Sequence, residues 1–216
     1  PEQWDLRLLC ASEYGNTFRT TRQCAKEFGL SLAINAGMYL PDDAGSHCSF
    51  MQNGVHVNSA RIGKQKGWVA ISPLRDGIPR AVIAEGAPDL REGLLKNYAT
   101  LIQNERVIAA PGEIVWKKDE RMWCMALLGM DGDGRMLFIF TRSPYTVHDF
   151  AEMLLKLPLG LRCAVYLDGG PPASLYVRHG GEEMELMGSY ESGIREDDTK
   201  RTASPIPNVI GIAPRG

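Results

Sequence analysis

Most apolar residues of this chain lie in short runs of strand length, and turn residues separate these runs. Such runs flank Asn53-Gly54, Asp76-Gly77 and Asp131-Gly132-Asp133-Gly134. Asn-Gly and Asp-Gly pairs favour β-hairpin turns because their backbones readily adopt positive φ angles. The third sequence also resembles the start of a calcium loop, but Arg135 and Arg142 stand where an EF-hand needs an oxygen ligand and a glutamate. We therefore predict a hairpin at each of these places.

Two segments have the spacing of amphipathic helices. The first, residues 17–28, follows Asn16 and precedes Gly29, a residue that often ends helices in the left-handed conformation. The second begins after Thr146, which with Asp149 three residues later forms a helix-capping pattern. Its apolar face and the proline that ends it are Val147, Phe150, Met153, Leu154, Leu157 and Pro158.

Strand-like runs also occupy residues 32–35, 163–167, 175–177 and 209–212. Residues 182–201 carry seven acidic and three basic side chains, a local net charge of −4, which indicates an exposed loop or hairpin. Many strands with two helices, joined largely by hairpin turns, predict an α+β fold with mixed or antiparallel sheets. The length of 216 residues fits a single domain over residues 1–216.

Composition narrows the possible partners. Lys and Arg number 24 against 26 Asp and Glu, so the net charge of −2 lacks the basic excess that binding to nucleic acid requires. The longest apolar run, residues 136–140, is far too short to span a bilayer, and we expect a soluble chain. The sequence starts at Pro1 and not at Met, as expected for a trimmed or mature chain.

The cysteines and histidines do not have metal-ligand spacing. The five cysteines are widely spaced without a C-x-x-C pair, and the four histidines are dispersed. We therefore expect no zinc site and no cofactor. Cys124 and Cys163 lie in apolar runs and are predicted to be free, buried thiols, while one or two disulfides stay open.

The sharpest candidate for chemistry is Asp168-Gly169-Gly170, which directly follows an apolar strand. A carboxylate held at a strand end, with glycines that permit close approach, is typical of a binding site, although the same residues also form a simple turn. Pro171-Pro172 stiffens the loop and Ser174 adds a hydroxyl. These two features favour the interpretation as a site.

A second strand end repeats this arrangement. Asn35 is followed by Gly37 and Tyr39, and the alternative is an asparagine in an ordinary turn. Arg121 precedes an apolar strand and Arg142 follows one. Both arginines could meet an anion, or could simply shield strand edges.

These motifs occur in an order that resembles the phosphodiester glycosidase family. The likeness extends from about residue 33 to residue 212. The residues that carry it are Ile34-Asn35-Ala36-Gly37-Met38-Tyr39, Arg121 ahead of the hairpin with Gly129, Asp131 and Gly134, Arg142, Tyr166-Leu167-Asp168-Gly169-Gly170, Ser174-Leu175, and Ile206-Pro207-Asn208-Val209-Ile210.

The resemblance implies hydrolysis of a sugar-1-phosphodiester at the anomeric carbon, through an oxocarbenium-like transition state. Asp168 would act as nucleophile, base or stabiliser of that transition state. Arg121 and Arg142 would hold the phosphate, since guanidinium groups bind phosphate oxygens in pairs. The residues implied to bind the sugar or to make room for it are Asn35, Gly37, Tyr39, Gly169, Gly170, Ser174 and Asn208. The usual habitat of the family implies a periplasmic or secreted location.

Two other classes of protein stay open. Pro171, Pro172 and Ala173 stand where the family commonly has Gly-Ser-Ser, which keeps a non-catalytic carbohydrate or cell-envelope binding module as an alternative. The other is a metal-dependent phosphodiesterase that uses Asp168 with Asp131 or Asp133. The sequence does not determine the sugar, the group beyond the phosphate, the stereochemistry or the oligomeric state.

Overall fold

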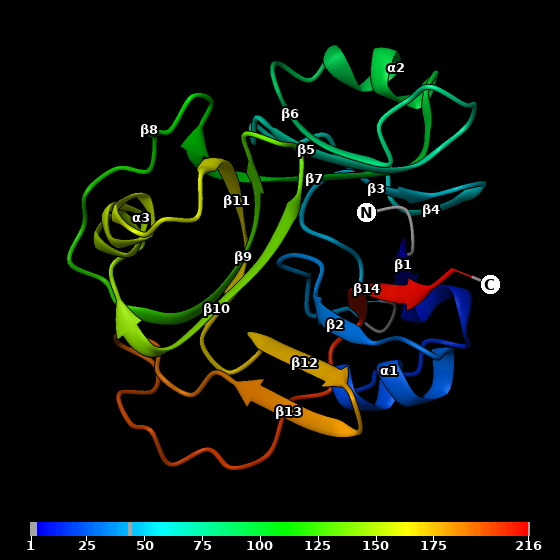
Figure 1. Ribbon diagram of the computed structural model, residues 1–216. Coiled ribbons are helices and arrows are strands. Elements are labelled where there is room, and N and C mark those ends of the chain that lie inside the picture. Colours follow the sequence, from blue (N-terminus) through cyan, green and yellow to red (C-terminus); the bar gives the residue numbers. More distant parts are fainter. Residues whose placement is uncertain (1–3, 43–44, 216) are drawn as a thin grey trace.

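The computed structural model describes residues 4–42 and 45–215, and its strands form two sheets (Figure 1). The smaller sheet has the order β1-β14-β2-β12-β13. The larger has the order β10-β9-β11-β7-β3-β4, with β5 and β8 also beside β7 and with β6 beside β5. The bounds are β1 Trp4–Cys10, α1 Thr21–Phe28, β2 Leu32–Asn35, β3 Met51–Asn53, β4 His56–Ser59, β5 Gly67–Pro73, β6 Ala81–Glu85, α2 Leu90–Leu95, β7 Tyr98–Ala109, β8 Glu113–Ile114, β9 Trp123–Asp131, β10 Met136–Tyr145, α3 Val147–Lys156, β11 Leu161–Gly169, β12 Ser174–His179, β13 Glu182–Met187 and β14 Asn208–Pro214, with a short 3-10 turn at Ala11–Glu13.

The inner faces of the two sheets share one apolar core. It joins Leu8, Ile34 and Ile210 of the smaller sheet to Val69 and Val165 of the larger sheet, all of them buried. Burial of apolar side chains contributes roughly 25 cal/mol for each Å² removed from water, so this shared core holds the sheets face to face. The ladders of both sheets are antiparallel throughout the described chain. The predicted α+β class is confirmed.

Each helix covers an outer face of a sheet (Figure 1). α1 packs Cys24 and Ala25 against the smaller sheet. α3 packs Phe150 and Leu154 against the larger sheet, and α2 buries Leu94 on the same sheet beside β5 and β7. The short helix α2 is additional to the two helices that the sequence predicts. None of the helices in the described ranges is long and apolar enough to cross a membrane.

The three predicted hairpins are confirmed. Asn53-Gly54 joins β3 to β4, Asp76-Gly77 lies between β5 and β6, and the Asp131–Gly134 sequence joins β9 to β10. Gly54 has φ 60° and Gly134 has φ 78°, the left-handed conformation that these turns need. Residues 182–201 form the second strand of a hairpin, β13, followed by an irregular segment.

The first helix begins later than the sequence predicts. Thr20, rather than Asn16, caps α1: its hydroxyl accepts a hydrogen bond from the Gln23 backbone N–H, and the Gln23 side chain accepts one from the Thr20 N–H. This reciprocal capping fixes the start at Thr21. Residues 17–20 precede the helix, and Arg19 there forms a backbone bridge with Ile206. The end at Gly29, with φ 67°, is as predicted.

Candidate functional site

The predicted residues Asn35, Ser174 and Asn208 lie together at one end of the smaller sheet. β2 ends at Asn35, whereas β12 begins at Ser174 and β14 begins at Asn208, so antiparallel pairing brings these three residues to the same end. The Oδ1 atom of Asn35 accepts a hydrogen bond of 3.1 Å from the backbone N–H of Ser174. Asn208 donates to the carbonyl of Gly45 at 2.8 Å and accepts from Asn58 at 3.4 Å.

Two polar atoms of this group have no protein partner. Asn35 Nδ2 and Ser174 Oγ are fully buried, and neither has a hydrogen bond within the described part of the chain. An unsatisfied buried polar group costs roughly 1–3 kcal/mol, so such atoms mark places where a ligand can supply the missing partner.

Gly37 lies in a cradle formed by two buried side chains. A Cβ atom at this position would lie 2.3 Å from His47 Nε2 and 2.6 Å from Asn104 Oδ1, and φ is 153°. Asn104 holds the chain there by donating to the carbonyl of Ala36 at 3.1 Å, while its Oδ1 lies 3.3 Å from His47 Nε2. Burial lowers the pKa of His47, which keeps the imidazole neutral.

Asp168 stands at the end of β11, in the larger sheet. The residue is half-buried, and its Oδ1 accepts a 2.8 Å hydrogen bond from the Gly169 N–H. Burial of the carboxyl raises the pKa of Asp168 to about 7; the Gly169 hydrogen bond opposes this rise, and the charge of Glu191 adds to it. A carboxyl group with this pKa can hold or release a proton near neutral pH.

Glu191 is the residue of this site that the sequence did not reveal. It lies on the segment after β13, and its backbone forms a bridge with Trp123 at the start of β9. A Cβ atom on Gly170 would lie 2.8 Å from Glu191 Oε2, so this carboxylate contacts the Asp-Gly-Gly loop. In the sequence Glu191 is one of several acidic residues in a charged stretch, and no signal separates it from the others.

The charge of Asp168 also reaches the loop that follows β2. Burial first, and this charge second, raise the pKa of Tyr39 and of the Cys48 thiol. Tyr39 forms a backbone bridge with His47, so it is tied to the cradle around Gly37. The end of β11 therefore faces the loop after β2, and the predicted residues of the two sheets share one region.

The charge of Arg121 reaches the same region. Burial and the charges of Asp168 and Glu191 raise the pKa of Tyr166, and the positive charge of Arg121 opposes that rise. The Arg121 guanidinium lies 5.1 Å from the ring centroid of Trp123, and the residue is exposed. Arg121 is thus close enough to act on the phenol that borders Asp168, and its donors are accessible to an anion.

The second predicted arginine has different neighbours. Arg142 donates to the carbonyl of Met187 at 2.8 Å and to that of Lys200 at 3.1 Å, and it forms an ion pair of 2.5 Å with Asp198. These contacts tie β10 to residues 187–200, which we call the strap. The Lys200 ammonium in turn donates to the carbonyl of Pro171, so the strap is attached to the loop after Gly170.

The glycines after Asp168 leave room for protein groups, not only for a ligand as the sequence suggested. A Cβ atom on Gly169 would lie 2.1 Å from the Tyr166 hydroxyl, and Gly170 has φ 65° beside Glu191. Gly188 of the strap approaches the same loop, with a hypothetical Cβ 2.1 Å from the carbonyl oxygen of Gly170. These close approaches bring Glu191 and Tyr166 to Asp168.

The pairing of Asp168 with Asp131 or Asp133 is not present. Asp131 ends β9, whereas Asp168 lies opposite Ala126 nearer the other end of that strand. The Asp131 carboxylate instead accepts a 2.6 Å hydrogen bond from Arg135 and binds backbone N–H groups within its own turn. Among the described residues, no group of three or more His, Cys, Asp or Glu has the arrangement of a metal site.

The fold and this strand-end site define a two-sheet α+β protein with two carboxyl groups close together at a strand end, and comparison with known proteins gives its family. The family model of phosphodiester glycosidases matches residues 28–213. The chain belongs to the phosphodiester glycosidase family. A comparison with curated protein sequences found no match.

Solved structures share the fold. The catalytic domain of zebrafish N-acetylglucosamine-1-phosphodiester alpha-N-acetylglucosaminidase, auto-inhibited by its pro-peptide, superimposes with a TM-score of 0.71 at 18% identity, over 99% of this chain and 74% of that one. A hypothetical protein from Synechocystis superimposes with a TM-score of 0.62 at 13% identity, over 99% of this chain and 57% of that one. At these identities, the TM-scores show a shared fold alone.

Proposed function

We propose that this protein hydrolyses a sugar-1-phosphodiester between the anomeric carbon and the phosphate oxygen. The observation that carries the proposal is Asp168, a carboxyl group with a pKa of about 7 at a strand end, beside the second carboxylate of Glu191. Pairs of carboxylates in one site are the usual machinery of glycoside hydrolysis. Membership of the phosphodiester glycosidase family supports the same reaction.

Asp168 is proposed as the general base. It removes a proton from water while the water oxygen bonds to the anomeric carbon, the bond from that carbon to the phosphate oxygen breaks, and a phosphomonoester leaves. The Glu191 carboxylate stabilises the positive charge that develops on the sugar ring. The phosphomonoester is a stable anion, so its departure needs little help from a general acid.

Three groups are proposed to hold the substrate. The exposed guanidinium of Arg121 binds phosphate oxygens, because its planar donors match them in pairs. Asn35 Nδ2 and Ser174 Oγ, both buried and without a partner in the described residues, bind sugar hydroxyls. Gly37 keeps the chain close to these atoms, and Tyr39 and Asn208 complete the wall of the site.

Hydrolysis in water labelled with ¹⁸O tests the reaction directly. The purified protein is incubated with an N-acetylglucosamine 1-phosphodiester, with a simple aryl glycoside of the same sugar and with bis(4-nitrophenyl) phosphate. We expect turnover of the first substrate alone, with the label in the sugar. Label in the phosphate, or turnover of the third substrate, would instead indicate a phosphodiesterase, and saturable binding without turnover would indicate a binding module.

A Glu191→Gln substitution should move the pH profile of the enzyme. Removal of the Glu191 charge takes away one cause that raises the pKa of Asp168, so this pKa falls. Because the ionised form of a general base is the active one, kcat/KM of the wild type should rise with pH through about 7, and this rise should occur at lower pH in the variant. Steady-state kinetics between pH 4 and 9 measure the shift, with Glu196→Gln on the same segment as the matched control. A wild-type profile that falls through this range would make Asp168 a general acid.

The two arginines should respond differently to removal of their charge. Arg142→Gln removes hydrogen bonds that hold the strap, so we expect a loss of roughly 1–3 kcal/mol in the free energy of unfolding, measured by urea denaturation. Arg121→Gln removes only an exposed contact with the Trp123 ring, so it should lower this free energy by no more than about 1 kcal/mol, and it should lower kcat/KM at least tenfold, since its exposed guanidinium can bind phosphate. An Arg142→Gln protein of unchanged stability and raised KM would assign phosphate binding to Arg142, as the sequence predicted.

A further inference from the structure

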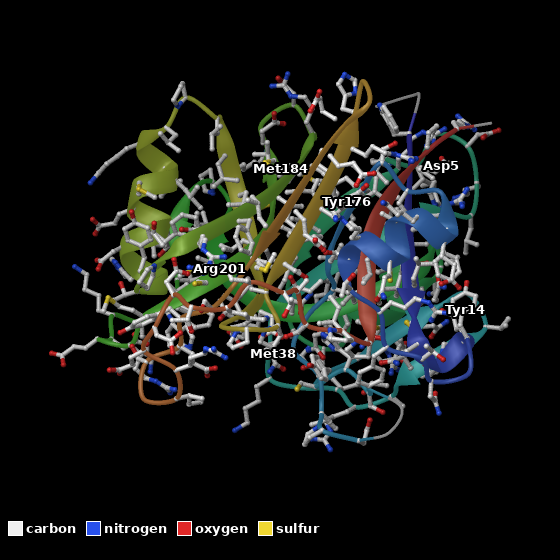
Figure 2. All side chains as sticks on the ribbon, turned by 90° about the horizontal axis from the view of Figure 1, so that it is seen from below. Asp5, Tyr14, Met38, Tyr176, Met184 and Arg201 are labelled. Atoms are coloured by element: carbon white, nitrogen blue, oxygen red, sulfur yellow. The ribbon has the colours of Figure 1, made fainter. Side chains whose placement is uncertain are left out.

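The end of the sandwich opposite Asp168 contains an apolar cavity between the two sheets. Its volume is about 780 Å³, within the range of roughly 300 to 1,000 Å³ that is common for small-ligand sites. Leu32 and Val177 of the smaller sheet line it, as do Met130, Met136 and Phe138 of the larger sheet. In Figure 2, Asp5 of β1 lies in the upper half of the view, whereas Met38, in the loop after β2, lies in the lower half.

The topology explains why the core is open here. β2 begins at Leu32 on this side and ends at Asn35 on the other, while β9 ends here at Asp131. The core residues on this side, including Met136, Phe138 and Val177, are only half-buried, in contrast to the fully covered middle of the sandwich. A large half-exposed apolar surface between two sheets is a place where an apolar group can be removed from water.

A second, polar cavity adjoins the first. Its volume is about 620 Å³, and it shares Trp4, Leu6 and Arg80 with the apolar cavity. Its lining contains four arginines and two aspartates, which leaves an excess of positive charge: Arg7, Arg75, Arg80 and Arg215 against Asp5 and Asp76. Arg80 pairs with Asp5 at 2.8 Å, and Arg75 donates to Asn97 at 2.8 Å. Arg7 and Arg215 are exposed.

We propose that the two cavities together bind one amphiphile, with its apolar chain between the sheets and its phosphate head among the arginines. Trp4, Leu6 and Arg80 border both cavities, so the apolar space and the cationic space adjoin, which matches a molecule that has both parts. Several guanidinium groups around one space suit a phosphate, because each can donate two hydrogen bonds to its oxygens. This site is separate from Asp168, and the proposal does not depend on the sugar-phosphodiester reaction.

Dodecyl phosphate, titrated below its micelle concentration, is the probe. Calorimetry and the fluorescence of the tryptophans, of which Trp4 lines both cavities, report the binding. We expect saturable binding of one molecule per chain, at least tenfold tighter than dodecanol, which lacks the head, and than inorganic phosphate, which lacks the chain. Binding that does not saturate, or that needs micelles, overturns the proposal. So does binding to anionic lipid vesicles without binding to the monomeric amphiphile, because that result indicates a membrane surface.

Two variants locate the ligand. The double substitution Arg7→Gln/Arg215→Gln removes exposed guanidinium groups and should weaken binding at least tenfold, which corresponds to the loss of one hydrogen bond to a charged group. Met136→Glu places a carboxylate in the apolar cavity and should abolish binding. The matched controls are Lys117→Gln/Lys118→Gln, which also removes two positive charges, and Met153→Glu, which also introduces a carboxylate, both at exposed positions elsewhere. The proposal is overturned if the variants bind dodecyl phosphate as tightly as their controls do. If Met136→Glu proves unstable, the comparison of the arginine variant with its lysine control decides.

Discussion

Asp168→Asn is expected to lose about a thousandfold in kcat on a sugar-1-phosphodiester, the size of effect typical for removal of a general base. Asparagine has nearly the same shape and keeps an oxygen that can accept the 2.8 Å hydrogen bond from the Gly169 N–H. The turn therefore survives while the proton acceptor is lost. Single-turnover kinetics with circular dichroism of the same sample separate the loss of chemistry from a loss of fold. Full activity in a folded variant would show that Asp168 only forms a turn and takes no part in the chemistry.

The same variant tests a pH dependence of the wild-type stability that does not depend on any substrate. The folded wild type holds its Asp168 proton up to about pH 7, whereas an unfolded carboxyl loses it near pH 3.9, so the folded state binds more protons between these values. The free energy of unfolding of the wild type therefore falls as pH rises through this range. Asp168→Asn should have a higher Tm than the wild type at pH 8 and an equal Tm at pH 3. Equal values at both pH values would mean that the carboxyl is not shifted.

Gly37→Ala is expected to lower the free energy of unfolding by roughly 3 kcal/mol or more. Two effects add: the overlap of the new Cβ atom with its neighbours, and the strain of a positive φ angle in alanine. The new Cβ atom would lie 2.3 Å from His47 Nε2 and 2.6 Å from Asn104 Oδ1, and φ at this position is 153°. Both neighbours are buried and hydrogen-bonded, so neither moves without losing a partner. Urea denaturation of the wild type and the variant measures the loss.

Gly54→Ala is the matched control for Gly37→Ala. Gly54 also has a positive φ, 60°, but a Cβ atom there would meet nothing within 4 Å. Gly54→Ala should therefore lower the free energy of unfolding only through backbone strain, by about 1 kcal/mol. Adding His47→Ala to Gly37→Ala should recover part of the loss if the overlap with the imidazole is its cause. If Gly37→Ala is no less stable than Gly54→Ala, the side chains of His47 and Asn104 move aside without a loss of stability, and the prediction is wrong.

The parts of the fold that could be predicted are those that local chemistry controls. The Asn-Gly and Asp-Gly turns set the hairpins, and Thr146 caps α3 by accepting a hydrogen bond from the Asp149 N–H, as its sequence pattern indicates. β7 was not predicted, because polar residues interrupt its pattern. Gln103 and Asn104 are buried in that strand, where they bond to backbone groups of distant loops and to His47. Alternation of apolar and polar residues cannot reveal a strand whose buried positions include amides.

The residues of the candidate site also differ in whether the sequence could indicate them. Short motifs indicated Asp168, Asn35 and Ser174, since each stands at a strand end beside turn residues, and the resemblance to the family added Asn208. The motifs could not indicate Glu191, because its place beside Gly170 depends on the course of the strap between β13 and β14. They also gave Arg121 and Arg142 the same role, although the two have different neighbours in the structure.

The sequence by itself determined where the chain turns, which runs are apolar and which family it belongs to, because these properties depend on neighbouring residues and on the order of motifs. Only the tertiary structure decided which charged groups share a region and which are bound by other parts of the protein. It placed Glu191 beside the Asp-Gly-Gly loop, bound Arg142 to the strap, and set an apolar cavity at the far end of the sandwich. The physical reason is that pKa values, burial and charge pairing depend on distances between residues far apart in the chain, which local patterns do not record.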